Sequence, residues 1–385
     1  MFSEFMTSKP LKYGYTTGAC AAAAAKGAAQ MLRDQQLVEA VEINLPCGTT
    51  ARFFLQGQEI RDNTASCYVV KDAGDDPDVT NGAEIHARVA IGFFTPQRFI
   101  IEGGRGIGRV TKPGLAVPVG EWAINPVPRR MILEGVKEVF AMRCLPATFT
   151  ITLSIPNGAE LAKKTLNARL GIIGGLSILG TSGIVKPISA KAWTDTIDAA
   201  IDVALACRSG TVVLSTGRSS ELVAQRYLAK QPPLIPPCQG GNSTPPLTRG
   251  GRKGLAEEAF VMMGDHVGYA LRACVRKGVK RVIIAAQFAK LLKIACGHEQ
   301  THAAAAELDL RMLAEWISLE PLTSHLAPLA LRANSARQVL HDSADDPALI
   351  ALVCGRAKEF ALKLAPALVL TVLLAGYDGE VLYFG

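Results

Sequence analysis

The chain has 385 residues, of which 49% are hydrophobic and 19% charged, so it is long enough for about two or three domains and too apolar to be disordered. Lysine and arginine exceed acidic residues by seven, but the basic residues are dispersed and aromatics make up only 6%, which favours a small polyanionic ligand over nucleic acid. The nine cysteines form no CxxC pair, which argues against disulfides or a thiolate zinc site and indicates a reducing cytoplasm.

The first half of the chain mixes helices and strands. Thr16 or Thr17 is expected to cap an alanine-rich helix over residues 19–32, because a hydroxyl can accept from the free amides of a first helical turn. Apolar patterns predict a hairpin and four strands, at 41–55, 66–70, 85–91, 98–102 and 149–153. Two more helices are predicted, at 127–142 and 158–170. We therefore expect an α+β domain over residues 1–189.

Residues 190–385 alternate strands with helices. Thr194 is expected to cap a helix over 195–207. Three apolar strands and two helices are then predicted, at 211–216, 281–286 and 368–374, and at 221–229 and 267–276. This alternation is typical of βαβ units, so we expect an α/β Rossmann-like domain with a mostly parallel sheet. A Pro- and Gly-rich segment at 231–254 interrupts the pattern and is predicted to be a surface loop.

No segment is expected to enter a membrane. The longest mainly apolar runs, 19–25 and 365–375, are shorter than the roughly 20 residues that span a bilayer. Residues 1–15 include Glu4 and lack the apolar stretch of a secretory signal. We therefore expect a cytoplasmic protein with no membrane or nucleic-acid partner, and the sequence leaves open whether it forms a homo-oligomer.

Two segments of the first half carry arginines where an anion could bind. Arg105 and Arg109 lie in the stretch GGRGIGR, whose backbone amides could approach an anion, although a tight turn explains the glycines equally well. Arg129 and Arg130 lie in the first turn of the helix predicted at 127–142, where the helix dipole disfavours cations. A bound carboxylate would offset that cost, and plain surface charge is the alternative.

The segment KDAGDDPD, at residues 71–78, places four carboxylates in a loop after a predicted strand. Its spacing does not match a calcium-binding EF-hand loop. Asp72, Asp75 and Asp76 are therefore candidates for proton transfer or for binding a cationic group, with solvated charge and Asx turns as the alternative.

The second half has a candidate ligand site after its first predicted strand. The sequence STGRSS ends that strand and precedes a helix, which is where nucleotide-like ligands bind in open α/β sheets. The candidate contacts are Ser215, Gly217, Arg218 and Ser219. Capping of the helix by Ser219 or Ser220 is the alternative explanation for the serines.

The segment HEQTH, at residues 298–302, matches the HExxH pattern. In that pattern two histidines one helical turn apart bind zinc and the glutamate activates a water. A zinc hydrolase built on His298, Glu299 and His302 would need a third ligand, and no HxxGxxH continuation follows. The alternative is two polar histidines, one of which could contact a substrate.

Five long motifs, in the same order along the chain, resemble the cobalt-precorrin-5B C1-methyltransferases of anaerobic cobalamin biosynthesis. They are YGYTTGAC from residue 13, KDAGDDPDVTNG from 71, GRGIGRVTKPGL from 104, INPVPRRMI from 124 and NARLGIIGGLSILGTSGIVKP from 167. Three shorter segments, STGRSSE, MGDHVGYAL and GHEQTH, are also similar to family segments. The family needs no glutamate after the first histidine of GHEQTH, so the HExxH match looks accidental. The loop at 231–254 departs from the family as an insertion.

The resemblance implies transfer of a methyl group from S-adenosylmethionine to C1 of cobalt-precorrin-5B, which gives cobalt-precorrin-6A. The cobalt belongs to the substrate, so no protein-bound metal is expected. The acetate and propionate arms of this polycarboxylated corrinoid match the net positive charge. A non-catalytic corrinoid-binding protein and the zinc hydrolase remain as alternatives.

We also hypothesise a role for each of the two domains. Loops of residues 1–189 are expected to bind the corrinoid, through Thr16, Thr17, Arg105, Arg109, Arg129 and Arg130. Residues 190–385 are expected to hold the methyl donor, through Ser215, Gly217, Arg218 and Ser219. A base could set the protonation state of the macrocycle, and the candidates are Asp72, Asp75, Asp76 and His302.

Overall fold

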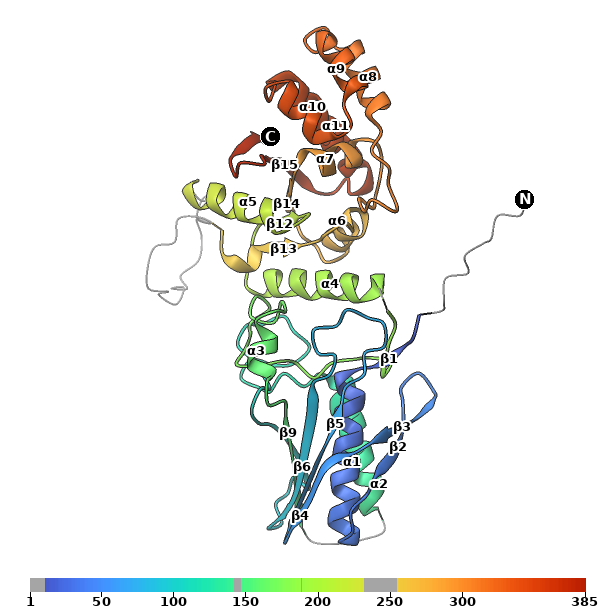
Figure 1. Ribbon diagram of the computed structural model, residues 1–385. Helices are drawn as coiled ribbons and strands as arrows, with labels where there is room; N and C mark the ends of the chain where they lie inside the picture. Colours follow the sequence, from blue (N-terminus) through green and yellow to red (C-terminus); the bar gives the residue numbers. More distant parts are fainter. Residues whose placement is uncertain (1–10, 142–146, 188, 232–254) are drawn as a thin grey trace, which may run out of the picture. The chain divides into compact units, whose positions relative to one another are not determined.

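The computed structural model describes residues 11–141, 147–187, 189–231 and 255–385. The loop predicted at 231–254 lies outside the described residues, apart from Gln231. The chain divides into two compact units, Met1–Ser189 and Ala190–Gly385, and each combines helices with sheets (Figure 1). The protein is therefore a mixed α/β structure.

The first unit contains eleven strands and three helices among its described residues. The strands are β1 (Gly14–Tyr15), β2 (Ala40–Asn44), β3 (Thr50–Phe54), β4 (Gln56–Arg61), β5 (Thr64–Val70), β6 (Glu84–Gly92), β7 (Phe99–Gly103), β8 (Arg109–Val110), β9 (Thr148–Ser154), β10 (Ile172–Ile173) and β11 (Ile184–Val185). The helices are α1 (Thr17–Asp34), α2 (Pro126–Phe140) and α3 (Gly158–Ala162).

The main sheet of this unit has the strand order β4, β5, β6, β9, β7. All neighbours are antiparallel except β7 and β9, which are parallel. Buried residues alternate with more exposed ones along β9, as expected for a strand with one face on a core. The strands predicted from this alternation and the β2–β3 hairpin are confirmed.

Helix α1 packs against β5 and β6 on one side and against α2 on another (Figure 1). Its alanine side chains are almost completely buried. The thiol of Cys67 in β5 donates a hydrogen bond of 3.2 Å to the carbonyl oxygen of Ala24, an approach that larger helix side chains would prevent. The alanine-rich composition therefore lets the sheet and α2 both lie close to α1.

The N-cap of α1 is Thr16, as predicted, and its hydroxyl oxygen accepts from the amide of Ala19 at 3.2 Å. We expect Thr16→Ala to lower the free energy of unfolding of the first unit by about 1 kcal/mol, because this amide loses its partner at a buried helix end. Thr16→Ser keeps the acceptor and is the matched control. Urea unfolding followed by far-UV circular dichroism measures both variants, and equal stability of the two would contradict the capping role.

Two predicted helix boundaries are wrong. The helix expected at 158–170 ends at Ala162, since side chains farther along compete for backbone partners. The hydroxyl of Thr165 donates to the carbonyl of Ala162, and the backbone amide of Asn167 donates to the hydroxyl of Thr165. The side-chain amide of Asn167 donates to the carbonyl of Gly175. The helix expected to follow Thr194 begins one turn earlier, so Thr194 lies inside it and its hydroxyl donates to a backbone carbonyl of that turn.

The second unit contains five strands and eight α-helices among its described residues. The strands are β12 (Val212–Ser215), β13 (Phe260–Met262), β14 (Arg281–Ala286), β15 (Val369–Ala375) and β16 (Val381–Phe384). The helices are α4 (Ala190–Ala206), α5 (Arg218–Lys230), α6 (Val267–Arg276), α7 (Phe288–Ala295), α8 (Leu310–Leu319), α9 (Ala327–Arg332), α10 (Ala336–Asp342) and α11 (Pro347–Leu364). Two 3-10 turns, η1 (Glu257–Ala259) and η2 (Ser324–Leu326), complete it.

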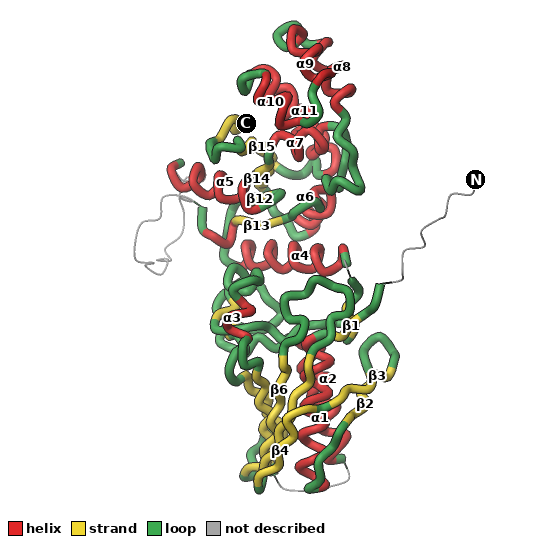
Figure 2. The backbone as a smooth tube through the Cα atoms, in the orientation of Figure 1, coloured by secondary structure: helices red, strands yellow, loops and turns green. Residues whose placement is uncertain are grey.

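The sheet of the second unit has the strand order β13, β12, β14, β15, β16. Figure 2 labels the four strands from β12 to β15. The first four strands are parallel and β16 is antiparallel. Helix α5 covers one face through Val223 and Leu228, and the apolar faces of α4, α6, α7 and α11 form a larger core on the other face. In the part of the chain that the structure describes, no helix combines the length and apolarity needed to cross a membrane.

Candidate functional site

Several predicted site residues of the first unit meet where its two long helices begin. Helices α1 and α2 run parallel, since Gly18 lies against Pro128 at their starts and Lys26 bonds Glu138 farther along. Their N-terminal ends, which carry the positive ends of two helix dipoles, therefore lie side by side. Thr17 at this end is buried, and its hydroxyl donates to the carbonyl of Leu179 at 3.2 Å.

Backbone hydrogen bonds join the surrounding loops to this end. The amide of Tyr15 donates to the carbonyl of Asp72 at 2.8 Å, which ties the acidic loop to the segment before α1. The amide of Asn125, before α2, donates to Ile178 at 2.9 Å. The structure therefore brings together Thr16, Thr17 and the loop that contains Asp72, three residues that the sequence marked as site candidates.

The acidic loop is held by two lysines. Lys71, whose side chain is 1% exposed, forms an ion pair of 2.6 Å with Asp78, and Asp78 also accepts from the amide and hydroxyl of Thr80 at 2.7 and 2.6 Å. On the exposed side, the side chain of Lys12 bonds Asp72 and its amide donates to Asp75, both at 2.6 Å. Two of the candidate bases thus bind protein cations or amides.

These contacts set the charge of the loop. Burial alone would raise the pKa of Asp78, but the hydrogen bonds from Lys71 and Thr80 outweigh burial and hold that pKa below its usual value. The hydrogen bond from Lys12 lowers the pKa of Asp72. Both carboxylates are therefore ionised at neutral pH and are weak proton acceptors.

Three of the four candidate arginines, Arg105, Arg109 and Arg130, differ in how firmly they are held. Arg109 stacks on the ring of Trp122, 4.0 Å from its centroid, and donates to the carbonyl of Gly120 at 2.7 Å. Arg105 and Arg130 are exposed. Within the described ranges, neither of these two side chains forms a hydrogen bond or an ion pair, so both guanidinium groups are free to bind an external anion.

The candidate donor contacts lie at the carboxyl end of β12. Ser215 is fully buried and its hydroxyl donates to Val261 at 3.4 Å, while Gly217 precedes α5 with an extended backbone and an open space beside its Cα. Ser219 is exposed. Helix α5 has no side-chain cap, so the alternative that Ser219 or Ser220 caps it is not supported.

Arg218 of this segment forms an ion pair of 2.7 Å with Glu221 in the same helix turn. Glu221 is fully buried although the arginine is 59% exposed. This pair therefore holds the start of α5, and the guanidinium has an open side toward solvent.

A polar network that the sequence interpretation missed lies at the same sheet edge. Asp265, just after β13, accepts from the hydroxyl of Thr301 at 2.6 Å and pairs with Lys290 of α7 through the same oxygen, Oδ1. Lys290 and Lys293 each donate to the carbonyl of Thr301 at 3.1 Å. Asp265 belongs to MGDHVGYAL, and the signal that could have found it is an acidic residue between a buried strand and a helix.

This network also fixes charges. Burial alone would raise the pKa of Asp265, but its hydrogen bonds to Lys290 and Thr301 hold that pKa below its usual value. Burial, and then the neighbouring Lys290, lowers the pKa of Lys293. The edge of the sheet therefore carries an ionised carboxylate that is held by Lys290 and Thr301.

Comparison with known proteins places the chain among relatives that share nearly its full length. A family model described as CbiD matches residues 5–187. A cobalt-precorrin-5B C(1)-methyltransferase of Citrifermentans bemidjiense is 63% identical, with 98% of this chain and 99% of that protein covered. The corresponding protein of Geobacter sulfurreducens is also 63% identical, over 99% and 100% of the two chains. The chain belongs to this methyltransferase family.

More distant relatives carry the same name. The cobalt-precorrin-5B C(1)-methyltransferase of Priestia megaterium is 42% identical over 86% of this chain and 83% of its own length. A crystal structure of the cobalamin biosynthesis protein CbiD from Archaeoglobus fulgidus shares 26% identity, covers 73% of this chain and 78% of its own, and has a TM-score of 0.37. The family model and the relatives at 42% and 63% identity confirm the family resemblance found in the five motifs.

The zinc-site geometry expected for HExxH is not formed in this family member. Residues 298–302 follow α7 and are not helical, so His298 and His302 are not placed one helical turn apart. Glu299 is bonded to Arg272, which lowers the pKa of Glu299, and Nδ1 of His302 accepts from the amide of Ala304 at 3.2 Å. In the described ranges, no three His, Cys, Asp or Glu residues are grouped as a metal site would need.

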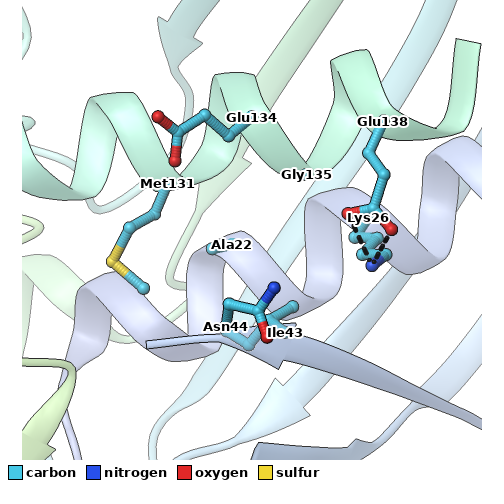
Figure 3. Close-up of a pocket in the computed structure, with 8 residues that line it drawn as sticks. All are labelled: Ala22, Lys26, Ile43, Asn44, Met131, Glu134, Gly135 and Glu138. Atoms are coloured by element: carbon cyan, nitrogen blue, oxygen red, sulfur yellow. Dashed lines mark hydrogen bonds and ion pairs between the residues drawn. The ribbon is translucent and has the colours of Figure 1, made fainter. Parts of the chain in front are cut away.

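A small cavity of about 80 Å³ lies between α1, α2 and the end of β2 (Figure 3). Lys26 crosses one side of it and contacts both carboxylate oxygens of Glu138 at 2.9 Å (Figure 3). None of the candidate site residues lines it. A cavity of this size holds a few waters and is far smaller than a corrinoid.

Proposed function

We propose that this protein transfers the methyl group of S-adenosylmethionine to C1 of cobalt-precorrin-5B and so forms cobalt-precorrin-6A. The observation that carries this proposal is the 63% identity, over 98% of the chain, to a relative named for methylation of that carbon. The segments that meet at the start of α1 and α2 include four of the five motifs shared with the family, from residues 13, 71, 124 and 167.

The corrinoid is proposed to bind at the loops of the first unit. Its carboxylate arms match the positive ends of α1 and α2 and the free guanidinium groups of Arg105 and Arg130. Arg129 in α2 and Arg109 in β8 are further proposed contacts for carboxylates, and Thr16 and Thr17 lie at the start of α1. The net charge of +7 favours the approach of a polyanion.

The methyl donor is proposed to bind in the second unit, which we interpret as a Rossmann-like domain. Strand β12 lies between β13, which follows it in the chain, and β14, so the strand order reverses at β12. Ligands of open α/β sheets bind at the carboxyl ends of the strands beside such a reversal. Ser215 ends β12 at that position and Gly217, Arg218 and Ser219 follow it, and the open space beside Gly217 leaves room for a ligand.

The chemistry needs alignment more than activation. When bound, S-adenosylmethionine supplies a sulfonium-activated methyl group, and the sulfur keeps the electron pair of the broken bond. The residues of this chain would orient the nucleophilic ring carbon and exclude water. Since Lys12 binds both Asp72 and Asp75, these two carboxylates are better suited to positioning than to proton transfer. Asp76 and His302 stay candidate bases by their chemistry alone.

The proposal is tested by anaerobic incubation of the protein with cobalt-precorrin-5B and methyl-labelled S-adenosylmethionine. One labelled methyl at C1, shown by mass and NMR analysis of the macrocycle, is the expected result. Corrinoid binding without consumption of the donor would instead support a carrier. Hydrolytic activity that depends on stoichiometric zinc would support the hydrolase.

Gly217→Ala tests the donor site without disturbing the fold. The backbone at Gly217 is extended and no atom lies within 4 Å of an added Cβ, so we expect unchanged stability. If the donor lies against this backbone, the methyl group should lower the affinity for S-adenosylhomocysteine by roughly tenfold, as overpacking by about 1–3 kcal/mol does.

Gly355→Ala is the matched control for that variant. Gly355 lies in α11 of the same unit and also has no atom within 4 Å of an added Cβ. Isothermal titration of both variants measures the affinity. Equal binding by Gly217→Ala and the unmodified protein would remove Gly217 from the donor site.

A further inference from the structure

The position of Asp265 in the fold resembles that of a nucleoside-binding carboxylate. Strand β12 is the first strand of the sheet in chain order, and Asp265 follows β13, the second strand and its direct neighbour. In dinucleotide-binding sheets an acidic residue in this part of the fold, after the second strand, accepts from the ribose hydroxyls of a ligand that lies over the first strand. Asp265 is three residues beyond the end of β13, at the same edge as Gly217.

One oxygen of Asp265 is available for a ligand. Thr301 and Lys290 both bond to Oδ1, and within the described part of the chain Oδ2 has no hydrogen-bond partner. Lys290 lies in α7, which follows β14, and Asp265 follows β13. Since β13 and β14 are the two neighbours of β12 in the sheet, the ion pair joins the segments that follow them. The carboxylate is therefore oriented by the protein while half of its accepting capacity stays open.

An exposed aromatic ring lies close to the two residues that flank Asp265. Trp193 of α4 is 47% exposed, and its ring is 3.8 Å from the position of a Cβ on Gly264, the residue before Asp265. The ring also lies 6.4 Å from that of His266, the residue after it. A flat, half-exposed indole next to an ionised carboxylate offers a stacking surface for a base and an acceptor for its sugar.

We propose that Asp265 and Trp193 form the nucleoside subsite of the methyl donor, in which Oδ2 of Asp265 accepts from a ribose hydroxyl and the indole of Trp193 stacks on the adenine. This subsite rests on the proposed function, since it takes an adenosyl ligand. Lys290 and Thr301 are positioning residues, because they hold Oδ1 and leave Oδ2 toward the ligand.

The test is isothermal titration of the full chain with S-adenosylhomocysteine and with its 2′,3′-dideoxy analogue. We expect Asp265→Asn to lower the affinity for S-adenosylhomocysteine by roughly tenfold or more, the usual cost of losing a hydrogen bond to a charged group. The unmodified protein should bind the dideoxy analogue more weakly than S-adenosylhomocysteine by about the same factor. Asp265→Asn should bind the two ligands alike, because both changes remove the same contact.

Trp193→Ala is a second variant, at an exposed position where we expect little effect on stability. It should lower the affinity for S-adenosylhomocysteine roughly tenfold, the cost of one lost stacking contact, whereas Trp193→Phe should keep most of it. Asp202→Asn, which removes an acidic partner of Lys277 elsewhere in the same unit, is the control for charge and should bind normally.

A failure of the proposed subsite and a failure of the proposed function would give different binding results. If the unmodified protein binds S-adenosylhomocysteine and both Asp265→Asn and Trp193→Ala bind it equally well, the subsite is overturned and the methyltransferase proposal stands. An Asp265→Asn variant that still discriminates against the dideoxy analogue would also overturn the ribose contact. If the unmodified protein binds no S-adenosylhomocysteine, the proposed use of this donor fails together with the subsite.

Discussion

Replacing Asp78 with alanine is expected to lower the free energy of unfolding of the first unit by about 3–5 kcal/mol, because it leaves the ammonium of Lys71 buried without its counter-charge. The side chain of Lys71 is 1% exposed, whereas that of Asp78 is 26% exposed and has Thr80 as a second partner. Lys71→Met should therefore cost less than Asp78→Ala, since the remaining carboxylate can reach water.

The double variant makes this prediction decisive. Lys71→Met combined with Asp78→Ala should be more stable than Asp78→Ala alone, because no buried charge is left unpaired. Asp72→Ala is the control in the same loop. The side chains of its ion pair, Asp72 and Lys12, are 53% and 67% exposed, so we expect the free energy of unfolding to fall by about 1 kcal/mol or less. If the double variant lost as much stability as the two single variants together, Lys71 and Asp78 would not stabilise the unit as a pair, and the prediction would be contradicted.

Urea unfolding can isolate the unit concerned. Trp122 is the only tryptophan of the first unit, because the other two, Trp193 and Trp316, lie in the second. Fluorescence of Trp122, in a background with Trp193→Phe and Trp316→Phe, therefore reports the unfolding of the unit that contains Lys71. A single transition is needed before free energies are compared.

Gly106→Ala is expected to destabilise the same unit by about 3 kcal/mol or more. The backbone of Gly106 has a φ of +75°, which costs a residue with a Cβ about 1–2 kcal/mol. An added Cβ would also lie closer than 3.0 Å to the carbonyl oxygen of Ile155, and such overpacking costs about 1–3 kcal/mol more. Backbone atoms on both sides leave no flexible side chain that could move away.

Gly120→Ala separates the two costs. Gly120 has a φ of +91° but no atom within 4 Å of an added Cβ, so only the conformational cost of about 1–2 kcal/mol is expected. The same tryptophan fluorescence measures both variants. If Gly106→Ala were no worse than Gly120→Ala, the close packing of this loop against Ile155 would not matter for stability. A shifted loop would also move Arg105, so corrinoid affinity should fall with Gly106→Ala under the proposed function.

The local structure near α1 follows from short-range rules. The hydroxyl of Thr16 caps the helix and the alanines after it favour helix and close packing, so both the start and the burial of α1 follow from a few neighbouring residues. The strands β6 and β9 show the alternation that a half-buried strand requires. Where a side chain bonds nearby backbone groups, as the hydroxyl of Thr165 does with Ala162 and Asn167, the same rules failed, because helix and turn compete there for the same groups.

The candidate site was only partly accessible from the sequence. Sequence motifs marked the acidic loop, the arginines and the segment after β12 as candidates. The structure places the acidic loop at the start of α1 and the segment after β12 at the sheet edge. Asp265 was missed because its partners, Lys290 and Thr301, are 25 and 36 residues away along the chain. HExxH looked like a zinc site because its spacing matters only on a helix, and residues 298–302 are not helical.

The sequence by itself determined the family, the helix capped by Thr16 and the alternation of strands with helices in the second half, because these depend on residues that are close along the chain or on long motifs. Only the tertiary structure showed that Lys71 is buried against Asp78 and that β13 and β14 flank β12. Those facts depend on how distant segments pack, since burial and strand order come from contacts that no local pattern encodes.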